Sequence, residues 1–261
     1  MAEKEKILRY FKAGGDEALA ARLLDLAEAA RKTGKYKVSE FLDPHEANVA
    51  EILCANFENI KLETCGGFAH AERNKAAFVA EDFAGNVDFG LAAFQVEWDK
   101  RYSQLGHRDI LGAFMGMGCK REILGDIVLI SEGAQFVADK NFLNYIQANL
   151  TQIGSANVSL KQIGLDQLEV KEEKVKLISA TVAALRLDAV AAAGYGTSRS
   201  RMAEEIKGQN VKVNWKEAKN AAQPVNEGDI LSFRGRGRVE VAEIRGTTKK
   251  GRLSITLKRY I

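Results

Sequence analysis

The sequence is poor in the residues that build covalent or metal-based sites. It contains three cysteines, Cys54, Cys65 and Cys119, and no CxxC pair. This pattern suits a reducing compartment and predicts neither a disulfide framework nor a zinc knuckle. The three histidines are equally scattered, so we expect no metal site. Only two prolines occur, Pro44 and Pro224, and an ordinary hydrophobic fraction of 46% indicates little disorder.

Long apolar segments are also absent. The first residues, MAEKEKILRYF, are charged and lack the apolar core of a signal peptide. No window of the sequence is apolar over the length needed to span a bilayer. We therefore expect a cytoplasmic protein with no membrane partner.

Positive charge is present but unevenly distributed. Residues 181–261 contain 16 Lys and Arg against 8 Asp and Glu, a net charge of +8, whereas the whole chain carries +3. Residues 1–180 therefore carry 3 − 8 = −5. A basic C-terminal end points to a nucleic-acid partner, and a solvated charged face is the alternative explanation.

The N-terminal third of the chain has the pattern of helices followed by short strands. Apolar residues recur at helical spacing over residues 16–31. A second helix is expected to begin after Asp43, because Pro44 fits the first turn and Glu46 completes a capping box. Two strands around a glycine turn follow, which makes this part a helical α/β domain.

The pattern changes to strand, helix, hairpin, helix and strand over residues 84–165. This order is that of the ferredoxin-like fold, which RNA-recognition domains also use. The order alone does not fix a function, and no aromatic consensus of the RNA-recognition type appears. Residues 166–180 are rich in Glu and Lys and are expected to form a linker, with an edge strand as an alternative within it.

The basic end of the chain begins with two short helices and a strand. The second helix is capped by Thr197 or Ser198 and carries Arg199 and Arg201 in its first turn, where the helix dipole disfavours cations. Two arginines at a helix N-terminus form a concentrated positive site that suits an RNA phosphate. The alternative is that Arg199 braces the first helix through Asp188.

Further arginines follow in the run RGRGR. Arg234, Arg236 and Arg238 are two residues apart, so on an extended chain all three would project from one side. A later strand, GRLSITLKR, alternates apolar residues with a polar side that includes basic residues. A solvated sheet face would explain this pattern too, but basic groups that converge from helix, loop and strand favour RNA.

The spacing of these motifs resembles the RNA-binding domain named after ribosomal protein S4. The resemblance is carried by Arg186, Leu187, Asp188, Gly194, Ser198, Arg199, Ala203, Ile206, Gly208, Val211, Lys212, Val213, Asn214, Gly228, Asp229 and Ile230. In that family two helices and a following strand hairpin clasp structured RNA such as rRNA or tRNA stems. Trp215 stands where the family usually has glycine, and an exposed indole there would stack on a base.

The resemblance and the charge pattern together name the expected RNA-binding residues. They are Arg186, Ser198, Arg199, Arg201, Lys207, Lys212, Asn214, Trp215, Lys216, Arg234, Arg236 and Arg238. Most of the affinity is expected from the surface formed by Arg199, Arg201, Lys212 and the segment 234–238.

The rest of the chain resembles a single family. The segments FLDPHEANVAEIL, GGFAHAER and GHRDILGAFMGMGCKREILGDIVL, ahead of an S4 domain, are similar to the YlmH-type proteins, with relatives connected with cell division or photosystem II. The resemblance implies a bacterial ribosome-associated quality-control factor that binds rRNA and tRNA on the large ribosomal subunit. It further implies that the factor holds a stalled peptidyl-tRNA while a protein partner of nascent-chain quality control extends the chain.

Two other functions fit parts of the sequence. One is an RNA-modifying enzyme with an S4 targeting domain, since S4 domains are often attached to pseudouridine synthases and rRNA methyltransferases. However, GAFMGMG lies inside a helical pattern and no Ser, Cys or Thr sits in an activating motif. We therefore expect no catalytic residues and no cofactor. The other is a cell-division scaffold whose acidic domains dock a protein partner.

The sequence as a whole predicts an α+β protein of three domains. They are a helical α/β N-terminal domain at 1–83, a ferredoxin-like (RRM-like) middle domain at 84–165 and, after a linker at 166–180, an S4-type (αL) RNA-binding domain at 181–261.

Overall fold

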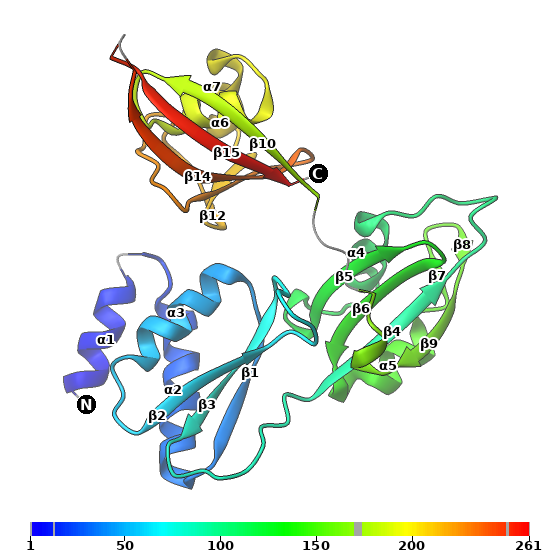
Figure 1. Ribbon diagram of the computed structural model, residues 1–261. Helices are drawn as coiled ribbons and strands as arrows, with labels where there is room; N and C mark the ends of the chain where they lie inside the picture. Colours follow the sequence, from blue (N-terminus) through cyan, green and yellow to red (C-terminus); the bar gives the residue numbers. More distant parts are fainter. Residues whose placement is uncertain (1, 13, 170–173, 249–250, 261) are drawn as a thin grey trace. The chain divides into compact units, whose positions relative to one another are not determined.

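The chain folds into two compact units, residues 1–170 and 171–261, both built from helices and antiparallel sheets (Figure 1). The computed structural model describes residues 2–12, 14–169, 174–248 and 251–260. The α+β class predicted from the sequence is confirmed. Among the described residues, no helix has the length and apolar character that crossing a membrane requires.

The first part of the N-terminal unit is a three-stranded antiparallel sheet covered by helices. Its elements are α1 (Ala2–Lys12), α2 (Glu17–Thr33), β1 (Tyr36–Leu42), α3 (Pro44–Cys54), β2 (Ile60–Cys65) and β3 (Asn74–Ala80), with strand order β1-β3-β2. The predicted capping box is present, because the Asp43 carboxylate accepts from the Glu46 N–H and the Glu46 carboxylate accepts from the Asp43 N–H. Leu23, Phe78 and their neighbours fill the core between helices and sheet.

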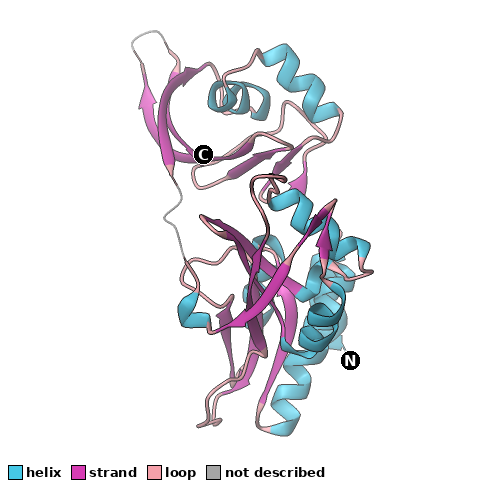
Figure 2. Cartoon of the chain, turned by 90° about the vertical axis from the view of Figure 1, so that its right-hand side faces the viewer, coloured by secondary structure: helices cyan, strands magenta, loops and turns pink. Residues whose placement is uncertain are grey.

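The second part of this unit has the predicted strand, helix, hairpin, helix and strand. Its elements are β4 (Leu91–Glu97), α4 (His107–Gly116), η1 (Arg121–Ile123), β5 (Leu124–Ile130), β6 (Gly133–Asp139), η2 (Lys140–Phe142), α5 (Leu143–Asn149), β7 (Gln152–Ile153), β8 (Ala156–Asn157), β9 (Ser159–Ile163) and η3 (Leu165–Gln167). The sheet order β5-β6-β4-β9 is that of a ferredoxin-like domain. Of the two central strands, β4 comes from the first strand–helix–strand half of the domain and β6 from the second. Figure 2 shows most helices of the N-terminal unit on one side of its strands and a short helical turn on the other.

A buried arginine joins the two parts of the N-terminal unit. Arg73 is 8% exposed and donates through Nε to the carbonyl of Leu124 at 3.1 Å and through Nη2 to that of Phe41 at 2.9 Å. Lys75, at the start of β3, forms an ion pair of 2.5 Å with Asp139 at the end of β6. The two parts therefore share buried polar contacts, and the predicted boundary near residue 83 stays a prediction.

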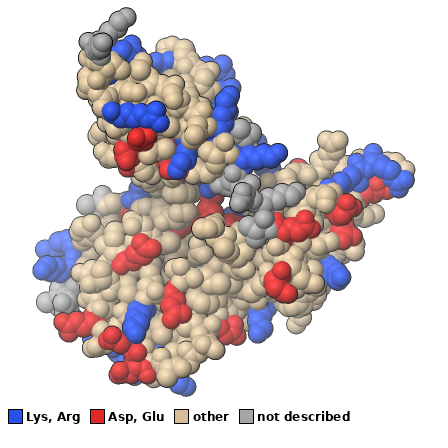
Figure 3. Space-filling view, in the orientation of Figure 1, with Lys and Arg blue, Asp and Glu red and all other residues tan. Residues whose placement is uncertain are grey.

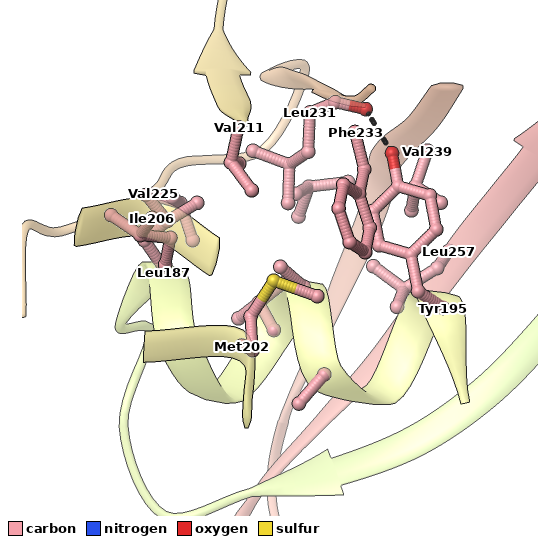
Figure 4. Packing of buried hydrophobic residues seen from close by; sticks show 14 of the residues in the cluster. Leu187, Tyr195, Met202, Ile206, Val211, Val225, Leu231, Phe233, Val239 and Leu257 are labelled. Atoms are coloured by element: carbon pink, nitrogen blue, oxygen red, sulfur yellow. Dashed lines mark hydrogen bonds between the residues drawn. The ribbon is translucent and has the colours of Figure 1, made fainter. Parts of the chain in front are cut away.

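The C-terminal unit is a six-stranded antiparallel sheet with two helices packed on it. Its elements are β10 (Val175–Val182), α6 (Leu187–Tyr195), α7 (Arg199–Lys207), β11 (Val211–Val213), β12 (Lys216–Glu217), β13 (Ile230–Phe233), β14 (Gly237–Thr247) and β15 (Leu253–Tyr260), in the order β10-β15-β14-β13-β11-β12. Side chains such as Tyr195, Met202 and Leu231 meet in its core (Figure 4).

Several elements differ from the sequence-based expectation, and helix α1 was not predicted. Strand β1 was not predicted, although it forms an edge of the first sheet. Within the expected linker at 166–180, the alternative of an edge strand is confirmed, because β10 begins at Val175 and pairs with β15 along its whole length. Residues 170–173 of that expected linker lie outside the described residues.

Candidate RNA-binding surface

The two helices of the C-terminal unit are clasped together by one buried carboxylate. Asp188, in the first turn of α6, accepts from Arg186 Nη2 at 2.8 Å and pairs with Arg199 Nε, at the start of α7, at 3.1 Å. The Asp188 side chain is 6% exposed, whereas those of Arg186 and Arg199 are 40% and 53% exposed. The bracing alternative for Arg199 is therefore what the structure has, and Arg186 shares the same role.

The ionisation of Asp188 reflects this clasp. Burial by itself raises the pKa of Asp188, but the hydrogen bonds from Arg186 and Arg199 outweigh that effect and hold the pKa below its usual value. The carboxylate therefore stays charged at neutral pH and neutralises one of the two guanidinium groups. The clasp presents a net charge of about +1 rather than +2.

Of the two predicted caps of α7, Thr197 and Ser198, the structure has Ser198. Its hydroxyl accepts from the Arg201 N–H at 3.3 Å and lies 3.2 Å from the Ser200 hydroxyl. Arg201 is exposed, and Lys207 is an exposed residue of the last turn of α7, where a cation suits the helix dipole. Ser198 is thus occupied with capping, while Arg201 remains available on the surface.

Asn214 and Trp215 form the turn between β11 and β12, and Asn214 has a structural role there. Asn214 Nδ2 donates to Asp229 Oδ1 at 2.8 Å, and its Oδ1 accepts from the Ile230 N–H at 2.8 Å. Both turn residues have left-handed backbones, with φ of 47° at Asn214 and 64° at Trp215. Trp215 is half-buried, and the stacking of its indole on a base stays a prediction. Lys212 and Lys216 flank this turn as exposed strand residues.

The run RGRGR is a hairpin turn, and the expectation of an extended segment is wrong. Phe233 at the end of β13 pairs with Gly237 at the start of β14, so the chain reverses between them. Gly235 and Gly237 have φ of 80° and 82°, a conformation that glycine adopts readily. Two of the predicted residues, Arg234 and Arg236, therefore lie in the turn, whereas Arg238 lies within β14.

Three arginines next to this hairpin lie over aromatic rings. The guanidinium carbon of Arg236 is 5.8 Å from the ring centroid of Phe233, that of Arg238 is 5.1 Å from Tyr260, and that of Arg259 is 5.6 Å from Tyr195. Two of the rings are in contact, since Tyr195 and Phe233 meet edge to face with their centroids 5.3 Å apart. We call Arg236, Arg238 and Arg259 the arginine cluster.

The ring of Tyr195 is fixed from within the fold. Its hydroxyl lies 2.7 Å from the carbonyl of Leu231 (Figure 4) and 2.9 Å from that of Gly237. Burial raises the pKa of Tyr195 well above its usual value, so the hydroxyl remains a donor. A cation stacked on such a fixed ring loses little freedom when it binds a ligand.

The charge of the arginine cluster is incompletely neutralised within the described part of the chain. Neither Arg236 nor Arg259 forms an ion pair with any described residue, and the nearby Glu240 is engaged by Lys258 at 3.1 Å and by the Tyr260 hydroxyl. Figure 3 shows Lys and Arg side chains on the C-terminal unit in one view. Arg259 was not among the residues predicted from the sequence.

Comparisons with known proteins place the chain in a family. The "putative RNA-binding domain in YlmH" matches residues 85–167, the N-terminal YlmH domain matches residues 16–83, and the S4 domain matches residues 185–231. The chain is 35% identical over 245 residues to the ribosome-associated protein quality control protein P2 of Bacillus subtilis strain 168, covering 94% of this chain and 95% of that protein. The chain belongs to the YlmH family.

A solved structure of this family agrees in fold. The cell division protein ylmH from Streptococcus pneumoniae aligns with a TM-score of 0.51 and 22% identity over 59% of this chain and 95% of that one. The membership confirms the resemblance drawn from the sequence, and the matches comprise an S4 domain and the domain described as the "putative RNA-binding domain in YlmH". Among the described residues, no three His, Cys, Asp or Glu side chains gather as a metal site would require.

Proposed function

We propose that this protein binds structured rRNA and tRNA on the large ribosomal subunit and stabilises a peptidyl-tRNA during the rescue of stalled ribosomes. The Bacillus subtilis relative, named for ribosome-associated quality control, supports the ribosomal setting. The two RNA-binding domain matches support RNA as the ligand. A nascent-chain quality-control protein would be the further partner.

The arginine cluster carries this proposal. Arg236 and Arg259 lie over aromatic rings and have no ion pair among the described residues, so their charge is available to phosphates. A guanidinium group donates two parallel hydrogen bonds to one phosphate, and stacking on a ring fixes its plane. Phosphate contacts of this kind provide affinity for folded RNA without reading its sequence.

The helix arginines are expected to contribute less than the sequence suggested. Arg186 and Arg199 share the Asp188 carboxylate, and a phosphate that approached them would have to compete with it. Arg201 has no such partner within the described residues and stays exposed beside the N-terminus of α7. We therefore assign the main phosphate contacts to the arginine cluster, with Arg201 and Lys212 as a second group.

Sedimentation with large ribosomal subunits through a sucrose gradient tests the proposal. The full-length protein should migrate with the subunit at low salt and separate from it at high salt, because phosphate contacts weaken as salt rises. The double variant Arg236→Gln and Arg259→Gln should bind at least about tenfold more weakly, since each lost phosphate contact removes roughly 1 kcal/mol.

The matched control also removes two positive charges, but from the surface of helix α2. Arg22 and Arg31 are exposed residues of α2, and their double glutamine variant should sediment like the wild type. Equal sedimentation of both double variants with the wild type would contradict the assignment to the arginine cluster. No sedimentation of the wild type with the subunit at any salt would contradict the ribosomal function itself.

A further inference from the structure

The sheet of the ferredoxin-like part has one face in the core and one face that the chain itself covers over β6 but not over β9, where Lys161 is exposed. Phe94 and Phe136 point into the core beneath α4 and α5. On the other face, Gln135 is 2% exposed and Val137 is 1% exposed. RNA-recognition domains of this architecture stack bases on the open face of the sheet, so the burial of that face needs an explanation.

Residues that follow β9 cover this face. The side-chain amide of Gln135 donates to the carbonyl of Gln167 at 3.3 Å, and its oxygen accepts from the Glu169 N–H at 2.7 Å. Leu165 lies against the same face, because a Cβ on Gly67 would come within 3.2 Å of Leu165 and 3.0 Å of Val137. Among the described residues of this face, none offers an exposed aromatic ring to a base.

The loop between β4 and α4 presents an exposed aromatic ring, which the sheet face lacks. It extends outward from the end of the sheet in Figure 1. Tyr102 in this loop is 82% exposed, the highest value among the large apolar side chains of the described chain. The guanidinium carbon of Arg101 lies 5.5 Å from the Tyr102 ring centroid. One cation and one aromatic ring are therefore offered to solvent together.

Hydrogen bonds hold this loop in shape. Trp98 Nε1 donates to the carbonyl of Ser103 at 3.0 Å, and the Tyr102 N–H donates to the carbonyl of Asp99 at 3.2 Å. The ammonium group of Lys100 donates to the carbonyls of Ile130 and Ser131 in the β5–β6 hairpin. A ring presented by an ordered loop binds with a smaller loss of entropy than one on a flexible segment.

The loop chemistry matches single-stranded RNA better than a protein surface. An exposed tyrosine stacks on any base, and Arg101 can exchange its exposed pair with Asp99 for a phosphate, because such a pair is weak in water. An apolar protein interface would offer several neighbouring apolar side chains, but the loop neighbours of Tyr102 are Arg101 and Ser103.

We propose that the β4–α4 loop binds an unpaired nucleotide, with Tyr102 stacking on the base and Arg101 contacting its phosphate. The ferredoxin-like part thus contacts RNA through this loop and not through its sheet. The inference rests on the proposed function, since it names the second RNA contact of the same protein.

Ultraviolet cross-linking of the intact protein to deproteinised large-subunit rRNA tests this inference. Trypsin cleaves after Arg101 and Arg108, so an adduct on Tyr102 would appear on the peptide 102–108. We expect a nucleotide adduct on this peptide and its loss in Tyr102→Ala. We also expect Tyr102→Ala to weaken binding of a labelled single-stranded oligoribonucleotide by about tenfold, and Tyr102→Trp to restore it.

The control is Tyr10→Ala, which removes an exposed tyrosine from α1, where no described cation lies over the ring. It should leave oligoribonucleotide binding unchanged. Cross-links confined to peptides of the C-terminal unit, with Tyr102→Ala binding like the wild type, would overturn the inference and leave the proposed function standing. Absence of cross-links in both units would instead overturn the proposed function.

Discussion

The arginines of the C-terminal unit fall into two groups that differ in their nearest neighbours. Arg186 and Arg199 face the buried carboxylate of Asp188, so their first effect is on stability. Arg236 and Arg259 face aromatic rings, which hold a cation without neutralising it. The same residue type therefore braces the helices at one place and presents charge at another.

The clasp predicts a pH-dependent loss of stability at the residue scale. The pKa of Asp188 is lowered in the folded unit, so its contribution to stability is present above the unfolded pKa of about 4. That contribution is lost as pH falls through the lower folded pKa. Asp188→Asn should lower the free energy of unfolding by about 1–3 kcal/mol near neutral pH, and the difference from wild type should shrink in acid.

Trp215 provides the measurement, because the chain has two tryptophans, Trp98 and Trp215, one in each unit. In a Trp98→Phe background, urea unfolding followed by fluorescence reports on the C-terminal unit alone. A stability difference between Asp188→Asn and its parent that is equal at neutral and acidic pH would contradict the clasp.

Arg259 shows where residue-level prediction from the sequence ends. In the alternation of β15, Arg259 falls on the same side as Ile255 and Leu257, the side that packs inward. Sequence alone therefore places it with the core and away from the charged face. At the end of the strand that inward side meets the ring of Tyr195, and only the three-dimensional arrangement shows that contact.

At the scale of elements, variants of Asn214 in the β11–β12 turn distinguish a structural role of this residue from a role in RNA binding. Asn214→Ala removes two side-chain hydrogen bonds and places alanine at a left-handed φ, so we expect a loss of about 2–3 kcal/mol in the stability of the C-terminal unit. Asn214→Gly should lose about 1 kcal/mol less, because glycine accepts that backbone. Urea unfolding gives both values.

The RNA affinity of the two variants decides the role of Asn214. Under conditions where each variant is fully folded, both should bind RNA like the wild type. A selective loss of RNA affinity in a folded Asn214→Gly protein would mean that this side chain contacts RNA directly, as the sequence had suggested.

Elements with a strong local signal were predictable, and those with a mixed signal were not. The helix α3 was predictable because Asp43, Pro44 and Glu46 define its start within four residues. Strand β1 was not, because its inward side includes Ser39, whose hydroxyl accepts from the Ala76 N–H and interrupts the apolar alternation. The run RGRGR fits an extended chain as well as a turn, and the pairing of β13 with β14 selects the turn.

At the scale of the whole molecule, Arg73 ties the two parts of the N-terminal unit together. Replacing it by leucine leaves the carbonyl of Phe41 without its buried guanidinium donor, whereas that of Leu124 keeps the hydrogen bond from Arg121 Nη1. We expect Arg73→Leu to destabilise the N-terminal unit by about 3 kcal/mol. Trp98 fluorescence in a Trp215→Phe background measures this unit.

The control for Arg73 is Arg22→Leu, which breaks an exposed pair with Glu40 and should change stability by less than about 1 kcal/mol. Equal urea midpoints for Arg73→Leu and Arg22→Leu would mean that the buried arginine does not join the two parts.

The salt dependence of RNA binding tests the central claim most directly. Binding of large-subunit rRNA is measured over a range of salt concentrations for the wild type, the Arg236→Gln and Arg259→Gln double variant, and the Arg22→Gln and Arg31→Gln control. The account predicts that log K falls less steeply with log salt for the double variant, with the magnitude of the negative slope reduced by about two. The control should keep the wild-type slope. An unchanged slope in the double variant would show that the arginine cluster does not contact RNA phosphates.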